Sequence, residues 1–231
     1  MAMNPDTRIS IIMPVLNEAA TLTGTLSGLQ PLRAAGHEII VVDGGSHDAS
    51  MPLAQPWADH VIGAERGRAR QMNAGAAIAR HDIWLFLHAD TQLPHHADQL
   101  IIEGLQKSNC LWGRFDVQLS GRQFMLRMVE RGMNWRSRLT GIATGDQAMF
   151  ICRDVFQRAG GFPDIPLMED ITLSSTLKHY SPPLCLSQCV ITSSRRWEQR
   201  GILRTILLMW RLRLAYAMGA DPQRLARPYQ S

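Results

Sequence analysis

The stretch DIWLFLHADT, residues 82–91, decides the fold prediction. Five apolar side chains in succession, from Ile83 to Leu87, predict a strand buried on both faces, because the run is too short for a helix. The strand stops abruptly at His88 and Asp90, whose side chains can bind metals or phosphates. A carboxylate at the carboxyl end of a buried parallel strand stands where open α/β sheets bind their ligands, although a structural role as the cap of the next helix explains it equally well.

The chain before this stretch has the form of a βαβ unit. Residues 9–16 and 38–42 are rich in β-branched and other apolar side chains and predict two strands, and residues 21–29 carry apolar side chains at helical spacing. Strand, helix and strand in this order predict a parallel sheet. Pro14 predicts that pairing of the first strand ends there or that the strand bends outward.

The rest of the chain continues to alternate between strands and helices, without repeats. We expect further strands at residues 59–62, 111–119 and 189–192, and a turn that leads into a strand within residues 144–151. Helices are expected at residues 67–75, 96–106, 124–139, 154–159, 171–179 and 201–218. This order predicts an α/β domain over residues 1–194, with a mostly parallel, Rossmann-like sheet and flanking helices. Residues 195–231 are expected to form a basic, apolar helical extension.

The charge is unevenly distributed along the chain. The 231 residues carry a formal net charge of +4, but the eight arginines after residue 194 face only Glu198 and Asp221, so residues 1–194 carry a net −2. A nucleic-acid partner is therefore not expected. The basic extension suits an anionic membrane surface, a diphosphate, or a helix face in water.

Cysteine usage and hydropathy indicate a cytoplasmic protein. Four cysteines, without a CxxC pair or zinc-finger spacing, predict reduced thiols. We find neither the pattern of a signal peptide nor an apolar run of about 18 residues, so a membrane contact would be peripheral, at the cytoplasmic face of the inner membrane.

Acidic residues recur at predicted strand ends and turns, at Asp43, Asp90 and the pair Glu169 and Asp170. A nucleotide-sugar transferase needs such a set: one carboxylate accepts hydrogen bonds from the base or ribose, one holds a divalent cation on the diphosphate, and one takes the acceptor's proton. Basic side chains can stabilise the departing diphosphate or can be solvated; the candidates are Arg68, Arg70, Arg195 and Arg196.

Motifs of three other enzyme classes are absent. A Rossmann dehydrogenase would carry G-x-G-x-x-G after the first strand, where this chain has NEAA. The P-loop motif G-x-x-x-x-G-K-[ST] and the serine-hydrolase motif G-x-S-x-G do not occur either. A nucleotidyltransferase on a similar sheet would need a glycine-rich basic loop near the N-terminus, which residues 17–29 do not offer.

Six segments in order resemble the motifs of family 2 glycosyltransferases, which have the GT-A fold of nucleotide-diphospho-sugar transferases. The segments are ISIIMPVLNE (9–18), IIVVDGGSHD (39–48), GRARQMNAGA (67–76), LFLHADTQLP (85–94), GDQAMF (145–150) and MEDITLS (168–174). Together with HAD at residues 88–90 and RRW at residues 195–197, the set resembles the bacterial radical-SAM/selenodomain-associated transferase 2 subgroup.

The resemblance implies a role for each matching position. The nucleotide, most often UDP, would be bound by Pro14, Asn17, Glu18, Asp43, Gly44, Arg68, Asn73, His88, Ala89 and Asp90. Asp90 would also ligate Mn²⁺ or Mg²⁺. Asp170 would be the general base, with Glu169 beside it, for a direct displacement that inverts the anomeric carbon. The diphosphate or the acceptor would be contacted by Asp146, Arg195 and Arg196.

The usual D-x-D motif of the family is His88-Ala89-Asp90 in this chain. Its second acid is the usual metal ligand, so metal binding is expected to survive. His88 is a nitrogen ligand, a support for the ligands, or a packed histidine at the end of a strand. The change leaves the sugar open, and a non-catalytic nucleotide-sugar-binding protein is the alternative to an enzyme.

The helix expected at residues 201–218 is largely apolar but contains Arg204, Arg211 and Arg213. This composition suits an interfacial helix on anionic lipid, where a lipid-linked acceptor would be found. It suits a homodimer interface, or packing on the chain's own domain, equally well.

Overall fold

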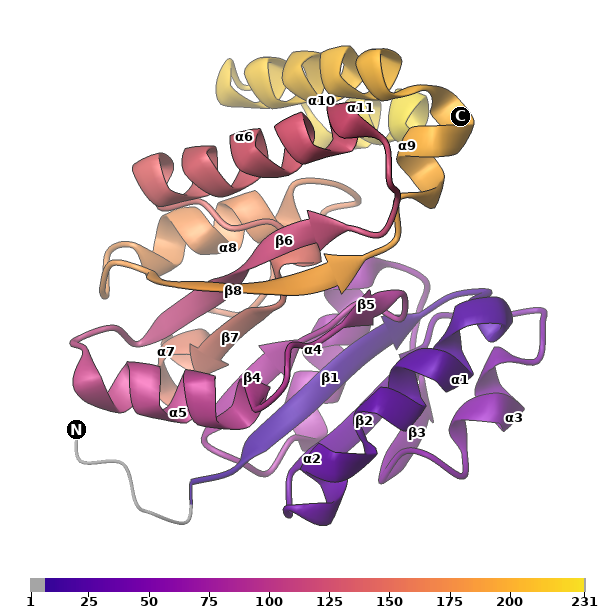
Figure 1. The fold of residues 1–231 in the computed structure, drawn as a ribbon, viewed down its shortest axis with the longest axis vertical. Coiled ribbons are helices and arrows are strands. Elements are labelled where there is room, and N and C mark those ends of the chain that lie inside the picture. Colours follow the sequence, from indigo (N-terminus) through magenta and orange to yellow (C-terminus); the bar gives the residue numbers. More distant parts are fainter. Residues whose placement is uncertain (1–6, 231) are drawn as a thin grey trace.

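The computed structural model describes residues 7–230, apart from the side chains of residues 196, 200 and 227–230. One eight-stranded mixed sheet runs through the molecule (Figure 1). Its strands, in spatial order, are β3 (His60–Gly63), β2 (Glu38–Asp43), β1 (Ile9–Val15), β4 (Ile83–Phe86), β7 (Met149–Cys152), β6 (Trp112–Leu119), β8 (Leu184–Thr192) and β5 (Thr91–Gln92).

Helices cover both faces of the sheet (Figure 1). They are α1 (Ala19–Gly28), α2 (Gln30–Ala34), α3 (Ser50–Ala54), α4 (Arg68–Ile78), α5 (Ala97–Lys107), α6 (Phe124–Thr140), the short 3₁₀ helix η1 (Gly145–Gln147), α7 (Arg153–Arg158), α8 (Glu169–Leu177), α9 (Arg195–Arg200), α10 (Ile202–Ala217) and α11 (Pro222–Gln230).

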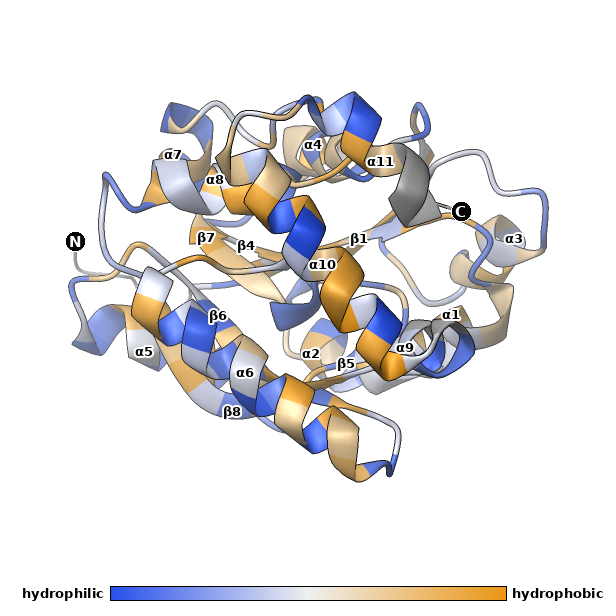
Figure 2. Cartoon of the chain, turned by 90° about the horizontal axis from the view of Figure 1, so that it is seen from above, coloured by the Kyte–Doolittle hydropathy of each residue, from blue (hydrophilic) through white to orange (hydrophobic). Residues whose placement is uncertain are grey.

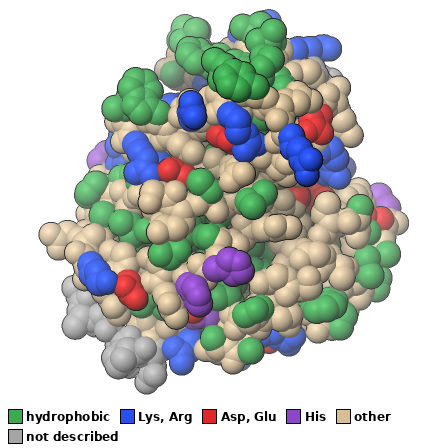
Figure 3. Space-filling view, in the orientation of Figure 1, with side chains coloured by type: hydrophobic (Ala, Val, Ile, Leu, Met, Phe, Trp, Pro, Cys, Tyr) green, Lys and Arg blue, Asp and Glu red, His purple; other side chains and the backbone are tan. Residues whose placement is uncertain are grey.

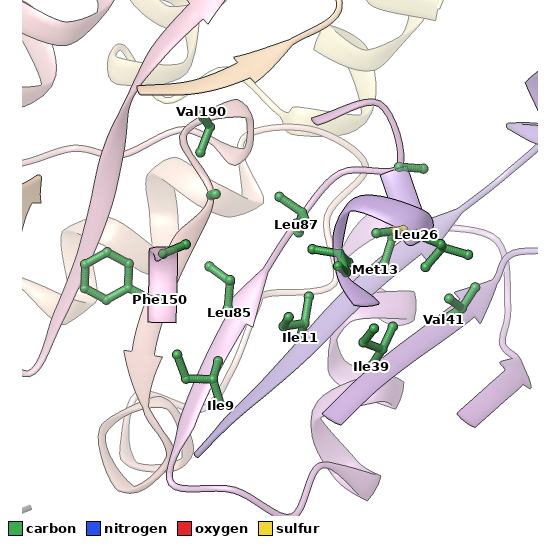
Figure 4. Close-up of a cluster of buried hydrophobic side chains, with 14 of the residues drawn as sticks. Ile9, Ile11, Met13, Leu26, Ile39, Val41, Leu85, Leu87, Phe150 and Val190 are labelled. Atoms are coloured by element: carbon green, nitrogen blue, oxygen red, sulfur yellow. The ribbon is translucent and has the colours of Figure 1, made fainter. Parts of the chain in front are cut away.

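The alternation of side chains along the central strands explains why their sequences are apolar throughout. Ile11 and Met13 of β1 point to the face covered by α1 and α5, where they join Leu26 and Val41 in one core (Figure 4). Ile12 points to the opposite face, in the core under α4, α7 and α8. Because both faces are covered, every position of β1 except the half-buried Pro14 is buried, and the strand is apolar apart from Ser10.

The sheet changes direction in its middle. Strands β3, β2, β1 and β4 are parallel, and β7 then pairs antiparallel with both β4 and β6. Strand β8 runs parallel to β6, and β5 is antiparallel to β8. The prediction of a mostly parallel α/β sheet is confirmed, since four of the seven pairings described here are parallel.

Pro14 lies inside β1 and does not end it. Pairing with β4 ends at Ile12, opposite Phe86, whereas pairing with β2 continues to Val15, opposite Asp43. Ile12 accepts a hydrogen bond on the β4 side from the N–H of Leu87. Residues two apart present their backbone groups to the same side, so the missing N–H of Pro14 faces the side where pairing has already stopped.

Two predicted boundaries were wrong. Strand β8 begins at Leu184 instead of residue 189, because its register beside β6 shifts between Phe115 and Asp116 and this irregularity breaks the alternation of the sequence. Helix α8 begins at Glu169 instead of residue 171, because Met168 precedes it in a left-handed conformation, with φ of 71°. The short elements α2, α3 and β5 had no periodic signal long enough to predict them, whereas α9 and α11 fall within the helical extension expected at residues 195–231.

The C-terminal helices lie against the sheet domain. Leu212 of α10 and Leu225 of α11 form a small core with Leu167 and Met168, which precede α8. The hydroxyl groups of Tyr216 and Thr172 are 2.5 Å apart and join α10 to α8. Within the described part of the chain, no helix has the length and apolar character needed to cross a membrane.

Candidate active site

Asp43, the last residue of β2, is buried, and only one of its two carboxylate oxygens accepts hydrogen bonds from described residues. Its Oδ2 accepts hydrogen bonds from the N–H groups of Gly45 and Ser46, each at 2.9 Å. Its Oδ1 is buried and has no hydrogen-bond partner among the described residues. A buried carboxylate oxygen without a donor is costly, so this atom is a candidate acceptor for a ligand N–H or O–H.

Asn17 fastens the loop after β1 to the loop after β2. Its N–H donates to Ser46 Oγ and its Oδ1 accepts from the N–H of His47, both at 2.9 Å. Asn17 has φ of 54°, a left-handed conformation that asparagine tolerates better than most residues. Its side chain therefore shapes the loops around Asp43.

Glu18 connects the same region to the C-terminal extension. Its N–H donates to Ser50 Oγ at 2.8 Å. Its Oε2 lies 3.5 Å from Nη2 of Arg195, the first residue of α9. The guanidinium of Arg195 therefore lies next to the carboxylate of Glu18. The side chain of Arg196 lies outside the described part of the chain.

Gln71 is a residue that sequence reasoning missed. Its buried side-chain amide donates to the carbonyl oxygens of Val15 and Val42, each at 2.8 Å, and so joins the ends of β1 and β2. A Cβ at Gly44 would lie 2.9 Å from this amide, which explains the glycine. The available signal was a glutamine between the small and apolar residues of the helix face that meets the sheet.

A second group of side chains surrounds a small pocket beyond the end of β4. Arg68, at the start of α4, donates from Nη1 to Glu169 Oε1 at 3.3 Å. His88 faces the turn at Gly145, where a Cβ would lie 2.7 Å from its Nε2. The pocket is lined by Arg68, Met72, Phe86, His88, Gly145, Met149, Phe162, Glu169 and Asp170. Three predicted site segments, at residues 68, 88 and 169–170, therefore meet.

The two acids at the start of α8 have different surroundings. Glu169 is only 2% exposed, and burial raises the pKa of its carboxyl although the Arg68 guanidinium opposes this. Asp170 is partly exposed in the pocket. Its Oδ2 accepts from the N–H of Gly145 at 2.8 Å and its Oδ1 from the N–H of Ile171 at 2.7 Å, so its orientation is fixed from two sides.

The segment that carries Asp90 is held from both sides. The carbonyl oxygen of Ala89 accepts a hydrogen bond from Thr25 of α1 at 2.7 Å, and Thr91 Oγ1 lies 2.9 Å from Thr192 Oγ1 of β8. The described residues contain no group of three or more potential ligand side chains that could hold a metal. A hard cation that takes most of its oxygens from a bound diphosphate and water needs only one or two protein carboxylates, and partly exposed Asp90 fits that demand.

Asn73 does not line the pocket itself but binds the backbone of a residue that does. Its Nδ2 donates to the carbonyl oxygen of Phe162 at 2.7 Å, and its Oδ1 accepts from the N–H of the same residue at 3.0 Å. Phe162 lines the pocket. Asn73 therefore positions a residue of the site through the backbone.

Asp146 lies in a charged group that includes two arginines missed by sequence reasoning. Burial raises the pKa of Asp146, while Arg136 of α6 and Arg213 of α10 oppose the rise. Burial lowers the pKa of Arg136 to about 10, and Arg213 adds to this effect. No spacing in the sequence relates these three positions, which come from separate elements.

The strand ends bring the acids to one edge of the sheet. Asp43 ends β2, and Asp90 lies in the turn four residues after β4. The two strands are parallel and lie on either side of β1, so their ends are separated by about 10 Å across the sheet. Asp170 reaches the same region through the pocket that it shares with His88. This arrangement can bind a ligand that bridges the ends of β2 and β4 and extends toward α8.

Comparison with known proteins defines the class. The model of glycosyl transferase family 2 matches residues 10–158, and the chain belongs to this family. A relative from Mycobacterium tuberculosis, the PGL/p-HBAD biosynthesis glycosyltransferase, is 34% identical over 98 residues, which make up 39% of this chain and only 38% of the relative.

Solved structures establish the fold. A fragment of S. aureus TarS in complex with UDP-GlcNAc matches 81% of this chain and 58% of its own chain, with a TM-score of 0.67 and 15% identity. The mannosyltransferase PcManGT from Pyrobaculum calidifontis, solved with GDP-Man and Mn²⁺, matches 90% of this chain and 61% of its own, with a TM-score of 0.63 and 21% identity. The predicted GT-A fold is confirmed, and the chain is a family 2 glycosyltransferase.

Proposed function

We propose that the protein transfers a sugar from a nucleotide-diphosphate donor to an acceptor hydroxyl, with inversion at the anomeric carbon. The observation that supports this best is the placement of three carboxylates at one edge of the sheet. Asp43 has a buried oxygen without a donor, Asp90 follows β4, and Asp170 is held in the adjoining pocket. The HAD and RRW elements support assignment to the radical-SAM/selenodomain-associated transferase 2 subgroup.

The proposed donor is a UDP-sugar. Oδ1 of Asp43 suits the N3–H of uracil, which needs an acceptor and is the edge that distinguishes this base from cytosine. The backbone of Gly44 and the loops ordered by Pro14, Asn17 and Glu18 would border the nucleoside. Arg68, His88 and Ala89 would flank the phosphates. TarS, a structural neighbour, was solved with UDP-GlcNAc.

Asp90 would hold Mn²⁺ or Mg²⁺ against the donor diphosphate, where the cation neutralises the charge of the leaving group. PcManGT, another neighbour, was solved with Mn²⁺. On the protein side, Arg195 and Arg196 would add positive charge near the diphosphate, since Arg195 already approaches Glu18.

In the proposed reaction the acceptor hydroxyl attacks the anomeric carbon and its proton passes to the Asp170 carboxylate. The bond between the anomeric carbon and the diphosphate oxygen breaks, and the diphosphate leaves with the electron pair. The N–H groups of Gly145 and Ile171 hold the Asp170 carboxylate in place. Glu169 keeps Arg68 in position and takes no proton from the acceptor.

Calorimetry with UDP and Mn²⁺ on wild type, Asp90→Ala and Asp170→Asn tests this function. We expect Asp90→Ala to lose the dependence of UDP binding on Mn²⁺. We expect Asp170→Asn to bind UDP but to lose turnover in a panel of UDP-sugars. Glu103→Gln, on the exposed side of α5, is the control. Binding of UDP without Mn²⁺ dependence in both wild type and Asp90→Ala, with no turnover, would indicate a non-catalytic binding protein.

We also propose that residues 195–231 form an extension that brings the domain, residues 1–194, to an anionic membrane surface and to a lipid-linked acceptor. Apolar side chains form a stripe along the outer side of α6 and another along α10, each residue between 61% and 76% exposed. The stripes consist of Phe124, Met128, Trp135 and Leu139, and of Leu203, Leu207, Trp210, Leu214 and Met218. Seen from above, both helices are uncovered (Figure 2), and apolar side chains gather at the top of the molecule (Figure 3).

Charge favours lipid over a second copy of the chain as the partner of this surface. The exposed charged residues of α6 and α10 include Arg131, Arg204 and Arg211, whereas the acid of α6, Glu130, is buried. A homodimer through this surface would bring arginines together, whereas anionic headgroups would neutralise them. We propose that the surface lies at the cytoplasmic face of the inner membrane.

Vesicle flotation tests the membrane proposal. We expect the protein to float with phosphatidylglycerol vesicles and less with phosphatidylcholine vesicles, and we expect the double variant Leu207→Glu, Trp210→Glu to stay in solution. The control, Leu53→Glu on α3, changes a half-exposed leucine outside the stripes and should float like wild type. A wild-type dimer in sedimentation that the double variant dissociates, without any flotation, would assign the surface to a second copy.

A further inference from the structure

Arg136 lies on α6 and Arg213 on α10, two helices that contribute Val129 and Ile202 to one small core. Arg213 lies on α10 between Leu212, which packs with Met168, and Tyr216, whose hydroxyl is 2.5 Å from Thr172 Oγ1. Both contacts fix this part of α10 against the first turn of α8, the turn that contains Asp170. Arg136 lies close enough to Arg213, Asp146 and Asp170 for their charges to act on its pKa.

The two guanidinium groups have buried donors without acceptors. Nη2 of Arg136 and Nε of Arg213 are both buried and lack a hydrogen-bond partner in the described part of the chain. Asp146 Oδ1 is buried and unpartnered as well, so the acid nearby does not satisfy these donors. Arginine remains protonated in proteins, so buried N–H groups of this kind require an acceptor.

Two neighbouring cations in a partly buried place are unfavourable without an anion. In this molecule the fixed acids are too far for an ion pair, since no carboxylate of the described residues lies within 4.0 Å of either guanidinium. A phosphate offers several acceptor oxygens to two guanidinium forks at once, which a single carboxylate on a fixed backbone does not.

We propose that Arg136 and Arg213 bind a phosphate group carried by the acceptor. The site adjoins Asp170, so a phosphate here would be held close to the hydroxyl that this residue deprotonates. The donor's diphosphate is assigned to the other side of the pocket, near Asp90 and Arg68. This inference rests on the proposed function, because it names the chemical class of the acceptor: a phosphorylated molecule, not a neutral glycan.

Titration of inorganic phosphate into the full-length protein, with and without saturating UDP and Mn²⁺, tests the inference. We expect the UDP-loaded protein to bind phosphate still, and Arg136→Gln and Arg213→Gln each to weaken phosphate binding about 10-fold or more. UDP affinity should change less than about two-fold. Arg80→Gln and Arg158→Gln, at exposed arginines outside both this site and the proposed membrane surface, are the controls and should bind phosphate like wild type.

Three outcomes would overturn the inference. UDP that displaces phosphate, together with a loss of UDP affinity in Arg136→Gln or Arg213→Gln, would assign the arginines to the donor diphosphate. Phosphate binding that neither variant weakens would remove the site, and so would equal weakening by the control variants.

Arg136→Lys and Arg213→Lys keep the charge and report on binding if a glutamine variant fails to fold. If wild type binds phosphate through these arginines but binds no UDP, the proposed donor fails while the anion site stands.

Discussion

The two halves of the sheet are built differently, and we propose that nucleotide binding belongs to one half and catalysis to the other. In the half formed by β3, β2, β1 and β4, parallel strands end at one edge, and short local hydrogen bonds order the loops that follow. In the half formed by β7, β6, β8 and β5, the candidate base is set by contacts between distant segments, such as the 2.8 Å bond from the Gly145 N–H to Asp170. The first half is suited to hold a nucleotide, and the second to present an acceptor.

The largest effect is expected from Asp170→Asn, in the second half. The amide cannot take a proton from the acceptor, so turnover should fall by about 10²–10⁴-fold. UDP affinity should stay within about two-fold of wild type, because we propose that the first half binds the nucleotide. Steady-state kinetics with parallel calorimetry measures both quantities. Equal losses in turnover and UDP affinity would show that nucleotide binding and catalysis are not divided between the two halves.

The complementary change is Asp43→Asn, in the first half. The amide can keep accepting from Gly45 and Ser46 through its oxygen, which leaves its NH₂ group where Oδ1 of Asp43 stands. Two donors would then face each other at the base edge, and UDP affinity should fall by about 10–100-fold. Turnover at saturating donor should fall far less. Calorimetry that finds unchanged UDP affinity would show that the unpartnered oxygen of Asp43 does not contact the base.

Gly145→Ala tests the contact between the halves. The added Cβ would lie 2.7 Å from His88 Nε2 and must displace this side chain or the turn, which costs about 1–3 kcal/mol of unfolding free energy. Gly132→Ala, in the middle of α6 with open space around the added Cβ, should be neutral or gain up to about 1 kcal/mol. Urea unfolding of both variants measures the difference, and equal stabilities would mean that His88 does not pack against the turn.

The smallest expected effect is a pH dependence from Glu169. Burial raises the pKa of this carboxyl in the folded protein above the ordinary value of 4.5, so the folded state binds the proton more tightly than the unfolded chain. The associated stability is fully present below pH 4.5 and is lost as pH rises through the folded pKa. Glu169→Gln lacks this loss, so wild type should become less stable relative to the variant as pH increases.

Urea unfolding of wild type and Glu169→Gln between pH 4 and pH 8 checks this sign. A wild type that gains stability relative to Glu169→Gln with rising pH would show that the attraction of Arg68, 3.3 Å away, outweighs burial. In that case the Arg68–Glu169 pair would bind the halves together electrostatically.

The sequence by itself determined the parallel half and the positions of its acids. The apolar runs at Ile9–Val15 and Ile83–Phe86 are local signals, since strands covered on both faces need apolar side chains at every position. Asp43 and Asp90 are predicted as site residues because each lies where such an apolar run has ended. Ten residues of sequence are enough to make each of these predictions.

Only the tertiary structure decided which side chains meet in the second half. Asp170 accepts from a residue 25 positions earlier, and Arg136 and Arg213 come from α6 and α10, between which the chain forms β7, α8 and β8. In the first half the same holds for Gln71, which joins the ends of β1 and β2. Such contacts have no period and no fixed spacing, because they depend on the crossing of elements and on a bulge in β8 that shifts its register. The physical reason is that burial and pairing act between surfaces, and these surfaces exist only after the chain has folded.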